Sequence, residues 1–358
     1  MVSQQRQNVL VVGAGIIGLV SAFRLLQEGC AVTVLDPSPA KGATWAAAGM
    51  IAPTAEIAVG EEANYELQRQ ALPAWRALGE ELRVLTGDEL QIVEKGTLLV
   101  GWDASDQRLV DQFARVAGTF GAALRESSRG EDPEEFAGVS ARITRGLLMA
   151  GDAWINPDEA VRLLLASLEL LGAKIIPSEV TRIESSDHDV RAVTALGDYV
   201  GGCGILATGA AGLVPGAPAS VRNAVRPVSG VTLRVRGFDR SDVATVRAFV
   251  RGRSLYVVSR PGGYCVLGAT VDERGESALE LGELARLTRD ALDVLPALES
   301  AVVLEHRSGL RPASRDLEPF FEQLGDTRWA WASGHYRHGV TLAPLTGASA
   351  VAFVRGVA

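Results

Sequence analysis

The first forty residues place a strand, a glycine-rich turn, a helix and a second strand in direct succession. Val9–Val12 is a short, continuous apolar run, which is typical of a strand buried on both faces. The segment 13–18, GAGIIG, follows at once, and apolar residues then recur at helical spacing as far as Leu26. A second apolar run at 31–35 ends at Asp36. This order predicts a parallel α/β sheet that opens with a dinucleotide-binding βαβ unit.

Each glycine of the turn has a separate use in such a unit. Gly13 permits the tight turn, Gly15 lets a pyrophosphate approach the backbone, and Gly18 allows close packing of helix on strand. The helix N-terminus offers free N–H groups to the phosphates, and Asp36 would accept hydrogen bonds from ribose hydroxyls. A tight turn without a ligand is the alternative. The two strands, the helix and the acidic residue together favour a dinucleotide.

A second run of small residues, GATWAAAGM at 42–50, follows soon after Asp36. Small residues allow backbone amides to approach a second phosphate or a ring system. The alternative is an ordinary alanine-rich helix start, because alanine is the best helix former. Glycines at both ends favour a cofactor-lining loop. The later strand and turn ILATG at 205–209 supports FAD, held in an extended pose across the sheet edge.

Two arginines lie beside predicted glycine-rich bends. Arg311 stands in GLRP at 309–312, and Arg337 stands in GHYRHG at 334–339. A guanidinium pairs with a carboxylate in bidentate fashion and stays charged, so these residues are candidates for anion recognition. Surface ion pairing is the alternative. His335 and His338 have a spacing that suits a metal, but no third ligand is evident and no metal is predicted.

Composition excludes several classes of function. The 358 residues carry 35 Lys plus Arg against 43 Asp plus Glu, a net charge of −8 that argues against nucleic-acid binding. Cys30, Cys203 and Cys265 are too scattered for a disulfide framework or a zinc site, which favours a reducing compartment and a cytoplasmic location. The uncharged stretches 9–23 and 340–354 contain Gly or Pro and fall short of the ~20 residues of a membrane span. No membrane association is predicted.

The pattern along the chain changes from α/β to β-rich and back to α/β. This change predicts a Rossmann-like FAD-binding domain interleaved with an antiparallel-sheet substrate domain, and not two consecutive domains. Residues 1–60, 140–222 and 300–358 are assigned to the FAD-binding domain. Residues 61–139 and 223–299 are assigned mainly to the substrate-binding domain.

Taken together, the motifs resemble the D-amino-acid oxidase family of FAD enzymes, and within it most closely the glycine oxidases of thiamine biosynthesis. The matching segments run nearly from end to end: GAGIIG at 13–18, TWAAAGMIAPTAE at 44–56, SLYVVSR at 254–260, VLGATVD at 266–272, GLRP at 309–312 and GHYRHGVTLAP at 334–344. Each segment alone is moderately specific. Their common order makes the resemblance strong, and it implies the D-amino-acid oxidase type of α/β fold.

The resemblance implies a role for each matching residue. FAD contacts are implied for Gly13, Gly15, Ile16, Ile17, Gly18, Asp36, Thr44, Ala48, Gly49, Met50, Val180, His335, Tyr336, Arg337, His338, Gly339, Val340 and Thr341. Among these, Ile16 and Ile17 would lie on the pyrophosphate, and the backbone of Val180 on the adenine. The segment 335–341 would follow the pyrimidine edge of the flavin. The substrate carboxylate would pair with Arg311, with Tyr256 and Arg337 nearby.

The implied activity is oxidation of glycine or another small amino acid. A hydride would pass from the α-carbon to FAD, the imine would hydrolyse to glyoxylate and ammonia, and O2 would reoxidise the flavin to give H2O2. No general acid or base is assigned, because correct placement of the reactants suffices. No cysteine follows Cys265, where related sarcosine oxidases often attach FAD, so the FAD is expected to be non-covalent. A homo-oligomer and a role in thiamine biosynthesis are further expectations.

Three alternatives stay open. The chain could be a sarcosine or D-amino-acid oxidase of the same family, a dehydrogenase that uses another electron acceptor, or a flavin-binding protein without turnover. Three positions depart from the family pattern. His338 stands where asparagine is commoner, Thr341 where leucine is, and Val271 where a bulkier methionine can narrow the pocket. These departures leave the preferred size of substrate open.

Overall fold

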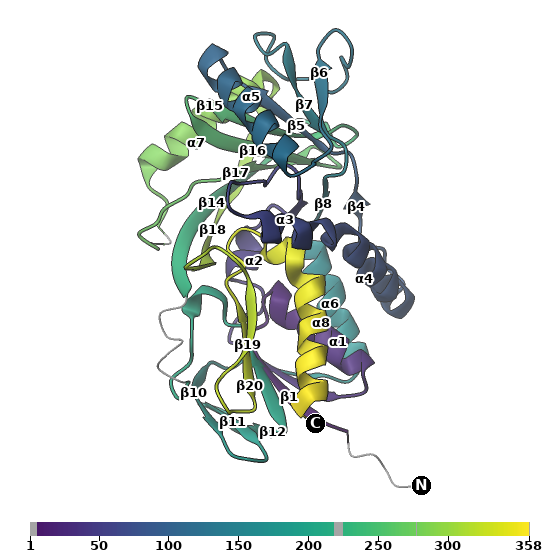
Figure 1. The fold of residues 1–358 in the computed structure, drawn as a ribbon, viewed down its shortest axis with the longest axis vertical. Helices are drawn as coiled ribbons and strands as arrows, with labels where there is room; N and C mark the ends of the chain where they lie inside the picture. The colour runs from purple at the N-terminus through teal and green to yellow at the C-terminus, as the bar shows by residue number, and fades with distance from the viewer. Residues whose placement is uncertain (1–5, 218–224, 277, 358) are drawn as a thin grey trace.

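Two sheets organise the fold, one toward each end of the molecule (Figure 1). The computed structural model describes residues 6–217, 225–276 and 278–357. The six-stranded sheet has the order β19 (Phe320–Gln323), β20 (Trp329–Ser333), β13 (Cys203–Leu206), β1 (Asn8–Val12), β2 (Ala31–Leu35) and β9 (Lys174–Ile176). All neighbouring strands are parallel except β19, which pairs antiparallel with β20 at the edge.

Both faces of the six-stranded sheet are covered. One face packs against α1 (Ile16–Gln27), α4 (Ala71–Thr86), α6 (Pro157–Leu170) and α8 (Gly339–Val357). The other packs against a small antiparallel sheet of β10 (Val180–Ser185), β11 (Val190–Thr194) and β12 (Gly197–Gly201).

Strand β1 shows how the sequence produces these two faces. Val9 and Val11 point to the helices, whereas Leu10 and Val12 join the core on the opposite face. The prediction of a strand buried on both faces is therefore confirmed.

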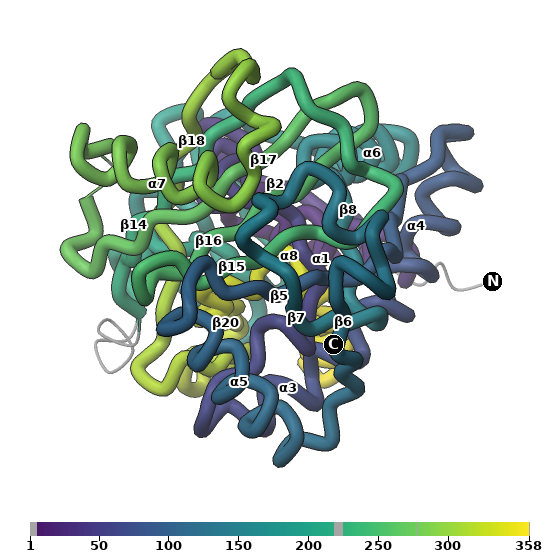
Figure 2. The backbone as a smooth tube through the Cα atoms, turned by 90° about the horizontal axis from the view of Figure 1, so that it is seen from above, coloured from purple at the N-terminus to yellow at the C-terminus, as the bar shows by residue number. Residues whose placement is uncertain are grey.

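The second large sheet is mainly antiparallel. Its order is β18 (Val302–Ser314), β14 (Val225–Arg236), β17 (Tyr264–Gly268), β16 (Arg253–Arg260), β15 (Thr245–Val250), β5 (Thr97–Gly101), β7 (Arg145–Met149) and β6 (Arg125–Ser128). Only β5 and β15 are parallel. Apolar residues of α7 (Leu281–Val294) cover one face, and α5 (Ala104–Thr119) packs on the other. From above, β5, β7, β15 and β16 cross in front of α1, α8 and β2 (Figure 2).

Short elements connect the two large sheets. Helices α2 (Ala43–Ala46) and α3 (Glu62–Arg69) lie between them, together with a three-stranded sheet of β3 (Met50–Ile51), β8 (Ala153–Ile155) and β4 (Ile92–Val93). Two short 3-10 helices, η1 (Gly209–Ala211) and η3 (Pro296–Ser300), complete the described helical elements. The segment 42–50, predicted as a loop, contains one helical turn in α2 and then becomes extended.

The interleaved α/β architecture confirms the predicted fold class. Three elements pack with the other domain from the one predicted. Strands β7 and β18, assigned to the FAD-binding domain, pair within the eight-stranded sheet. Helix α4, assigned to the substrate-binding domain, packs on the α1 side of the six-stranded sheet. Backbone pairing explains β18, because β14 and β18 pair from Val225 opposite Ser314 to Arg236 opposite Val302. The exact domain bounds stay a prediction, and the bound at 222/223 and residues 1–5 lie outside the described residues.

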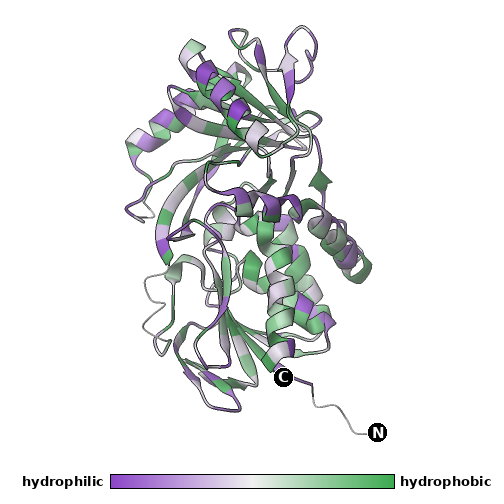
Figure 3. Ribbon diagram, viewed as in Figure 1, coloured by the Kyte–Doolittle hydropathy of each residue, from purple (hydrophilic) through white to green (hydrophobic). Residues whose placement is uncertain are grey.

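Helix α8 is the longest apolar helix. Of the helices in 6–217, 225–276 and 278–357, it alone has the length, 19 residues, and the composition that crossing a membrane would require. It packs along α1, and a Cβ added at Gly347 would lie 2.9 Å from Cγ1 of Val20. Figure 3 shows the two neighbouring helices as largely hydrophobic. In this fold α8 is thus a core helix, as the prediction of a buried segment requires.

Candidate active site

A large cavity of about 1250 Å3 lies between the two sheets. Its lining combines the turn after β1, the segment 36–50, the segment 207–211, the end of β18 and the start of α8. This volume exceeds the roughly 300–1,000 Å3 of ordinary small-ligand sites. The cavity therefore has room for a dinucleotide and a small second ligand.

The turn after β1 leaves an open cradle at one end of the cavity. Gly13 has φ +102°, and a Cβ there would lie 2.3 Å from the carbonyl oxygen of Ala207. Gly15 is different: it has an ordinary φ of −70° as the N-cap of α1, and a Cβ there would meet only Oγ1 of Thr44, at 3.5 Å. The protein itself thus leaves free space beside Gly15, at a helix N-terminus that favours an anionic ligand.

Asp36 is held beside this cradle. Its carboxylate accepts hydrogen bonds from the N–H groups of Ala14 at 2.6 Å and Ser38 at 2.7 Å. Because a carboxylate has about four acceptor positions, this leaves capacity for the hydroxyls of a ribose. Asp36 also lines the cavity, as the predicted contact requires.

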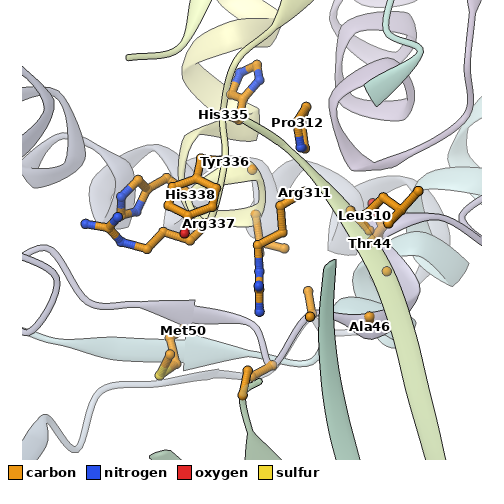
Figure 4. Close-up of a pocket in the computed structure, with 18 of the residues that line it drawn as sticks. Thr44, Ala46, Met50, Leu310, Arg311, Pro312, His335, Tyr336, Arg337 and His338 are labelled. Carbon is orange, nitrogen blue, oxygen red and sulfur yellow. The ribbon is translucent and has the colours of Figure 1, made fainter. Parts of the chain in front are cut away.

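Arg311 occupies the other end of the cavity, on β18. It was expected beside a glycine-rich bend, but β18 continues through it to Ser314, so the strand fixes its backbone. Its Nη1 donates to the carbonyl oxygens of Ser229 at 3.2 Å and Thr270 at 3.4 Å. Within the described residues its Nη2 has no hydrogen-bond acceptor and no carboxylate pairs with it. Figure 4 shows the guanidinium extending into the space between Met50 and Ala46.

Two glycines make room for Arg311 and for Tyr256 of β16. A Cβ added at Gly230 would lie 2.1 Å from Nη2 of Arg311, and one at Gly268 would lie 2.3 Å from the Tyr256 hydroxyl. Burial raises the pKa of Tyr256, so its phenol stays neutral and can donate a hydrogen bond. This end of the cavity thus combines one cation with one neutral donor, a set suited to a carboxylate.

Arg337 lines the same cavity but is engaged by the protein. Its Nε lies 2.6 Å from Glu56, and its Nη2 lies 3.1 Å from Glu61. Arg247 pairs with the other oxygen of Glu56 at 2.7 Å. Figure 4 shows Arg337 directed away from Arg311. The predicted contact of Arg337 with substrate stays a prediction, whereas the pairing shows that it anchors a buried ionic network.

Sequence reasoning gave Glu56 and Arg247 no role. Burial alone would raise the pKa of Glu56, but Arg247 and Arg337 outweigh it and hold that pKa at about 2. Glu56 closes the segment 44–56 that carried the family resemblance, which was the one available signal. Arg247 offered none, because nothing in its local sequence indicates that it reaches Glu56.

We expect Glu56→Ala to lower the free energy of unfolding by about 3 kcal/mol, because it leaves Arg247 without its carboxylate and removes one partner of Arg337. Denaturant unfolding of the apoprotein measures this loss. Glu94→Ala, which breaks the more exposed pair with Arg76, serves as control and should cost less than about 1 kcal/mol. Equal losses in both variants would contradict the importance of the network.

The two buried histidines are neutral. Burial lowers the pKa of His335 to about 4, and burial together with Arg337 lowers that of His338 to about 3. His335 Nε2 lies 2.8 Å from Oγ1 of Thr346, whereas His338 Nε2 lies 4.0 Å from Glu61 and has no hydrogen-bond partner among the described residues. In the described part of the chain no three potential ligands cluster as a metal site would require. That no metal is used stays a prediction.

These pKa values predict how stability depends on pH. The unfolded chain binds protons at its histidines below about pH 6.5, whereas the folded chain does so only near pH 4 and 3. Stability should therefore fall as the pH falls from 6.5 to 4, by up to ~1.4 kcal/mol per pH unit for each histidine. His338→Asn should reduce the dependence of stability on pH by the His338 share, up to ~1.4 kcal/mol per pH unit, measured by urea unfolding at several pH values.

Asp152 should change stability with pH in the direction opposite to the two histidines. It is fully buried, and burial raises its pKa to about 7 although the N–H groups of Thr54 and Ala55 donate to it. The folded state thus takes up a proton at Asp152 before the unfolded state does, which stabilises the fold as the pH falls from 7 to 4. In Asp152→Asn the free energy of unfolding should therefore fall more steeply as the pH is lowered from 7 to 4. A variant with an unchanged slope would refute the assignment.

Nearly all the predicted site residues line this cavity. Gly18 and Val180 are the exceptions. A Cβ on Gly18 would lie 1.9 Å from the carbonyl oxygen of Gly13, so Gly18 has the packing role expected of the third glycine. Val180 begins β10 and is buried in the core beneath the six-stranded sheet, so its contact with adenine stays a prediction. Cys30, Cys203 and Cys265 lie outside the cavity lining, and non-covalent binding of the cofactor stays a prediction.

The parallel sheet presents an open helix N-terminus to the cavity, and the second sheet presents an arginine to the same cavity. This arrangement is that of a flavin-dependent oxidoreductase. The chain belongs to the FAD dependent oxidoreductase family, whose profile matches residues 8–352. The family and the cofactor predicted from the sequence are confirmed. The cavity fits FAD, because the lack of a side chain at Gly15 leaves space at the helix N-terminus for the pyrophosphate.

Relatives support this placement along the whole chain. The chain is 29% identical over 353 residues to the glycine oxidase of Geobacillus kaustophilus, covering 96% of this chain and 91% of the relative. It is 30% identical to a putative thiamine biosynthesis oxidoreductase of Rhizobium etli, covering 94% and 93%. The crystal structure of the Geobacillus kaustophilus glycine oxidase has a TM-score of 0.85 at 25% identity, covering 99% of this chain and 95% of that one.

Proposed function

We propose that this protein is an FAD-dependent oxidase of glycine or another small amino acid. The observation that carries the proposal is Arg311: a guanidinium with an unpaired Nη2, beside the neutral phenol of Tyr256, at the substrate end of an FAD-sized cavity. When bound, FAD supplies the acceptor for a hydride from the α-carbon, and O2 as final oxidant yields H2O2. The names of the relatives support glycine as the substrate.

The residues of this chain would bind and orient the reactants. The turn at 13–17, Asp36, the segment 44–50 and the segment 335–341 would hold FAD, since each lines the cavity. Arg311 would fix the substrate carboxylate, which places the α-carbon against the flavin in a near-attack geometry. No group of the protein needs to remove a proton, because an amine that binds neutral supplies its own lone pair. Water would then convert the imine to glyoxylate and ammonia.

The proposed role in the cell is in thiamine biosynthesis. The Rhizobium etli relative supports a role in thiamine biosynthesis, where the imine itself would be the useful product. A cytoplasmic location and a homo-oligomer complete the proposal, and light scattering of the purified holoenzyme would measure its assembly.

Anaerobic addition of glycine to the yellow holoenzyme tests the activity. We expect the flavin absorbance to bleach and, on admission of air, to recover with release of H2O2. Bleaching by sarcosine or D-alanine but not by glycine would favour the alternative oxidases. Bleaching that persists in air but is reversed by a quinone would indicate a dehydrogenase. A holoenzyme that no small amino acid bleaches would overturn the proposal.

A further inference from the structure

Four successive backbone carbonyls, of residues 45–48 at the cavity wall, accept hydrogen bonds from side chains of the eight-stranded sheet; Ala46, Ala47 and Ala48 themselves line the cavity. Arg307 Nη1 donates to Trp45 at 3.1 Å, Thr232 Oγ1 to Ala46 at 3.0 Å, Arg234 Nη2 to Ala47 at 2.9 Å and Arg260 Nη2 to Ala48 at 3.0 Å. The donors come from β14, β16 and β18. The carbonyls of residues 45–48 therefore all point to the sheet.

The geometry of the peptide bond fixes where the opposite groups point. In a trans peptide the N–H is directed opposite to the C=O of the same unit. The carbonyls of Ala47 and Ala48 face Arg234 and Arg260, so the N–H groups of Ala48 and Gly49 face away from the sheet, toward the cavity that these residues line. Among the loop and turn hydrogen bonds of the described residues, none is donated by either N–H. Two donors are thus presented to the ligand.

Two of the arginines behind the segment, the buried Arg234 and the partly buried Arg260, are cations that are not paired with a carboxylate in the described part of the chain. Arg234 is 7% exposed, and burial lowers the pKa of Arg234 and Arg260 to about 10. Arg307 pairs with Asp158 and Glu305, but among the described residues no carboxylate lies within ion-pair distance of Arg234 or Arg260. Nε and Nη1 of Arg234 and Nε of Arg260 have no hydrogen-bond partner within residues 6–217, 225–276 and 278–357.

Such an arrangement is costly if it serves only to hold the backbone. Burial of a charge without an opposite charge is unfavourable, and a neutral donor can hold a carbonyl equally well, as Thr232 does for Ala46. A cation bonded to a carbonyl also polarises the peptide, which strengthens its N–H as a donor. The positive charge therefore acts through the segment on whatever lies in the cavity.

We propose that Arg234 and Arg260, assisted by Arg307, are positioning residues that raise the reduction potential of bound FAD. They direct the amides of Ala48 and Gly49 at the cofactor and place positive charge behind the segment 45–49. Because FAD gains electrons on reduction, fixed donors and positive charge bind the reduced form more tightly than the oxidised form. The inference rests on the proposed function only in taking the flavin ring to lie against this segment.

Mediator-coupled titration of the holoenzyme with dithionite tests the proposal without any amino acid. In Arg234→Gln and in Arg260→Gln we expect the ratio of the affinity for reduced FAD to that for oxidised FAD to fall about tenfold. This change corresponds to a fall of ~30 mV in the two-electron midpoint potential. Arg234→Lys keeps the charge and should recover most of the potential. The affinity of the apoprotein for oxidised FAD should change much less than tenfold in all three variants.

Arg240 provides a matched control. It is 5% exposed, donates to the carbonyls of Ala244 and Glu135 at 2.6 Å, and does not line the cavity. Burial lowers its pKa to about 10 as well. Arg240→Gln should therefore reduce thermal stability to a similar extent as Arg234→Gln but leave the midpoint potential unchanged.

The outcomes separate this inference from the proposed function. Wild-type potentials in both Arg234→Gln and Arg260→Gln, or an equal shift in Arg240→Gln, would overturn the inference even if glycine reduces the enzyme. A lowered potential in an enzyme that glycine does not reduce would support the inference while the proposed substrate fails. If Arg234→Gln does not bind FAD, Arg260→Gln and Arg234→Lys decide the result.

Discussion

Arg311→Ala is expected to oxidise glycine with a kcat/KM roughly a thousandfold below that of the wild type. The variant would leave the substrate carboxylate without its cation in a desolvated cavity, and the loss of one partner of such a pair costs about 2–5 kcal/mol. Most of the effect should lie in KM, since the contact forms with bound substrate as well as with the transition state. Steady-state peroxide production measures both constants.

Two further variants make the result specific to the guanidinium. Arg311→Lys keeps the charge but loses the fork geometry, and we expect an intermediate loss. Arg315→Ala removes an exposed arginine just past β18 that does not line the cavity, and its kinetics should be unchanged. The flavin spectrum should stay that of the wild type in all three. Wild-type glycine kinetics in Arg311→Ala would refute its role as the carboxylate anchor.

Gly15→Val should weaken binding of FAD by at least a hundredfold while the stability of the apoprotein hardly changes. The backbone at Gly15 is ordinary, with φ −70°, and the nearest atom to an added Cβ lies at 3.5 Å, so the protein tolerates a side chain. The added methyl groups would instead occupy the space beside the N-terminus of α1, where a pyrophosphate is expected. Fluorescence titration of the apoprotein with FAD gives the affinity, and its melting temperature gives the stability.

Gly18→Ala is the contrasting control. A Cβ there would lie 1.9 Å from the carbonyl oxygen of Gly13, so the apoprotein itself should be strongly destabilised. A Gly15→Val protein that binds FAD normally would show that the pyrophosphate does not lie beside this turn. A Gly15→Val apoprotein that melts as early as Gly18→Ala would show that the turn needs glycine for packing alone.

Local patterns were sufficient to predict the parallel sheet and the first half of the site. The strand, turn and helix at 9–26 follow from residues adjacent in sequence, and their geometry is largely independent of the rest of the chain. The glycine turn, Asp36 and the small-residue run 42–50 followed in the same way, whereas the separate contacts of Ile16, Ile17 and Thr44 followed from the family resemblance. The ordered motifs then made Arg311 and Tyr256 identifiable before their positions in the fold were known.

Contacts between distant segments could not be predicted. Glu56 pairs with Arg337, and Arg234 reaches the carbonyl of Ala47, across long separations in sequence. No periodicity or motif encodes which face of which strand an arginine will occupy. The same reason explains β18: its glycine and proline suggested a bend, but pairing with β14 over its whole length overrode that local preference.

The chain order of the six-stranded sheet has a consequence for synthesis on the ribosome. Its parallel strands β1, β13 and β20 are neighbours in space but lie at 8–12, 203–206 and 329–333 in the chain. The core that α8 forms with α1 likewise joins residues 339–357 to residues 16–27. Strand β1 can pair with β2 and β13 once residue 206 has been made, but the sheet gains β20 and the core gains α8 only when nearly the whole polypeptide is available. Completion of this sheet and of its core should accordingly be mostly post-translational.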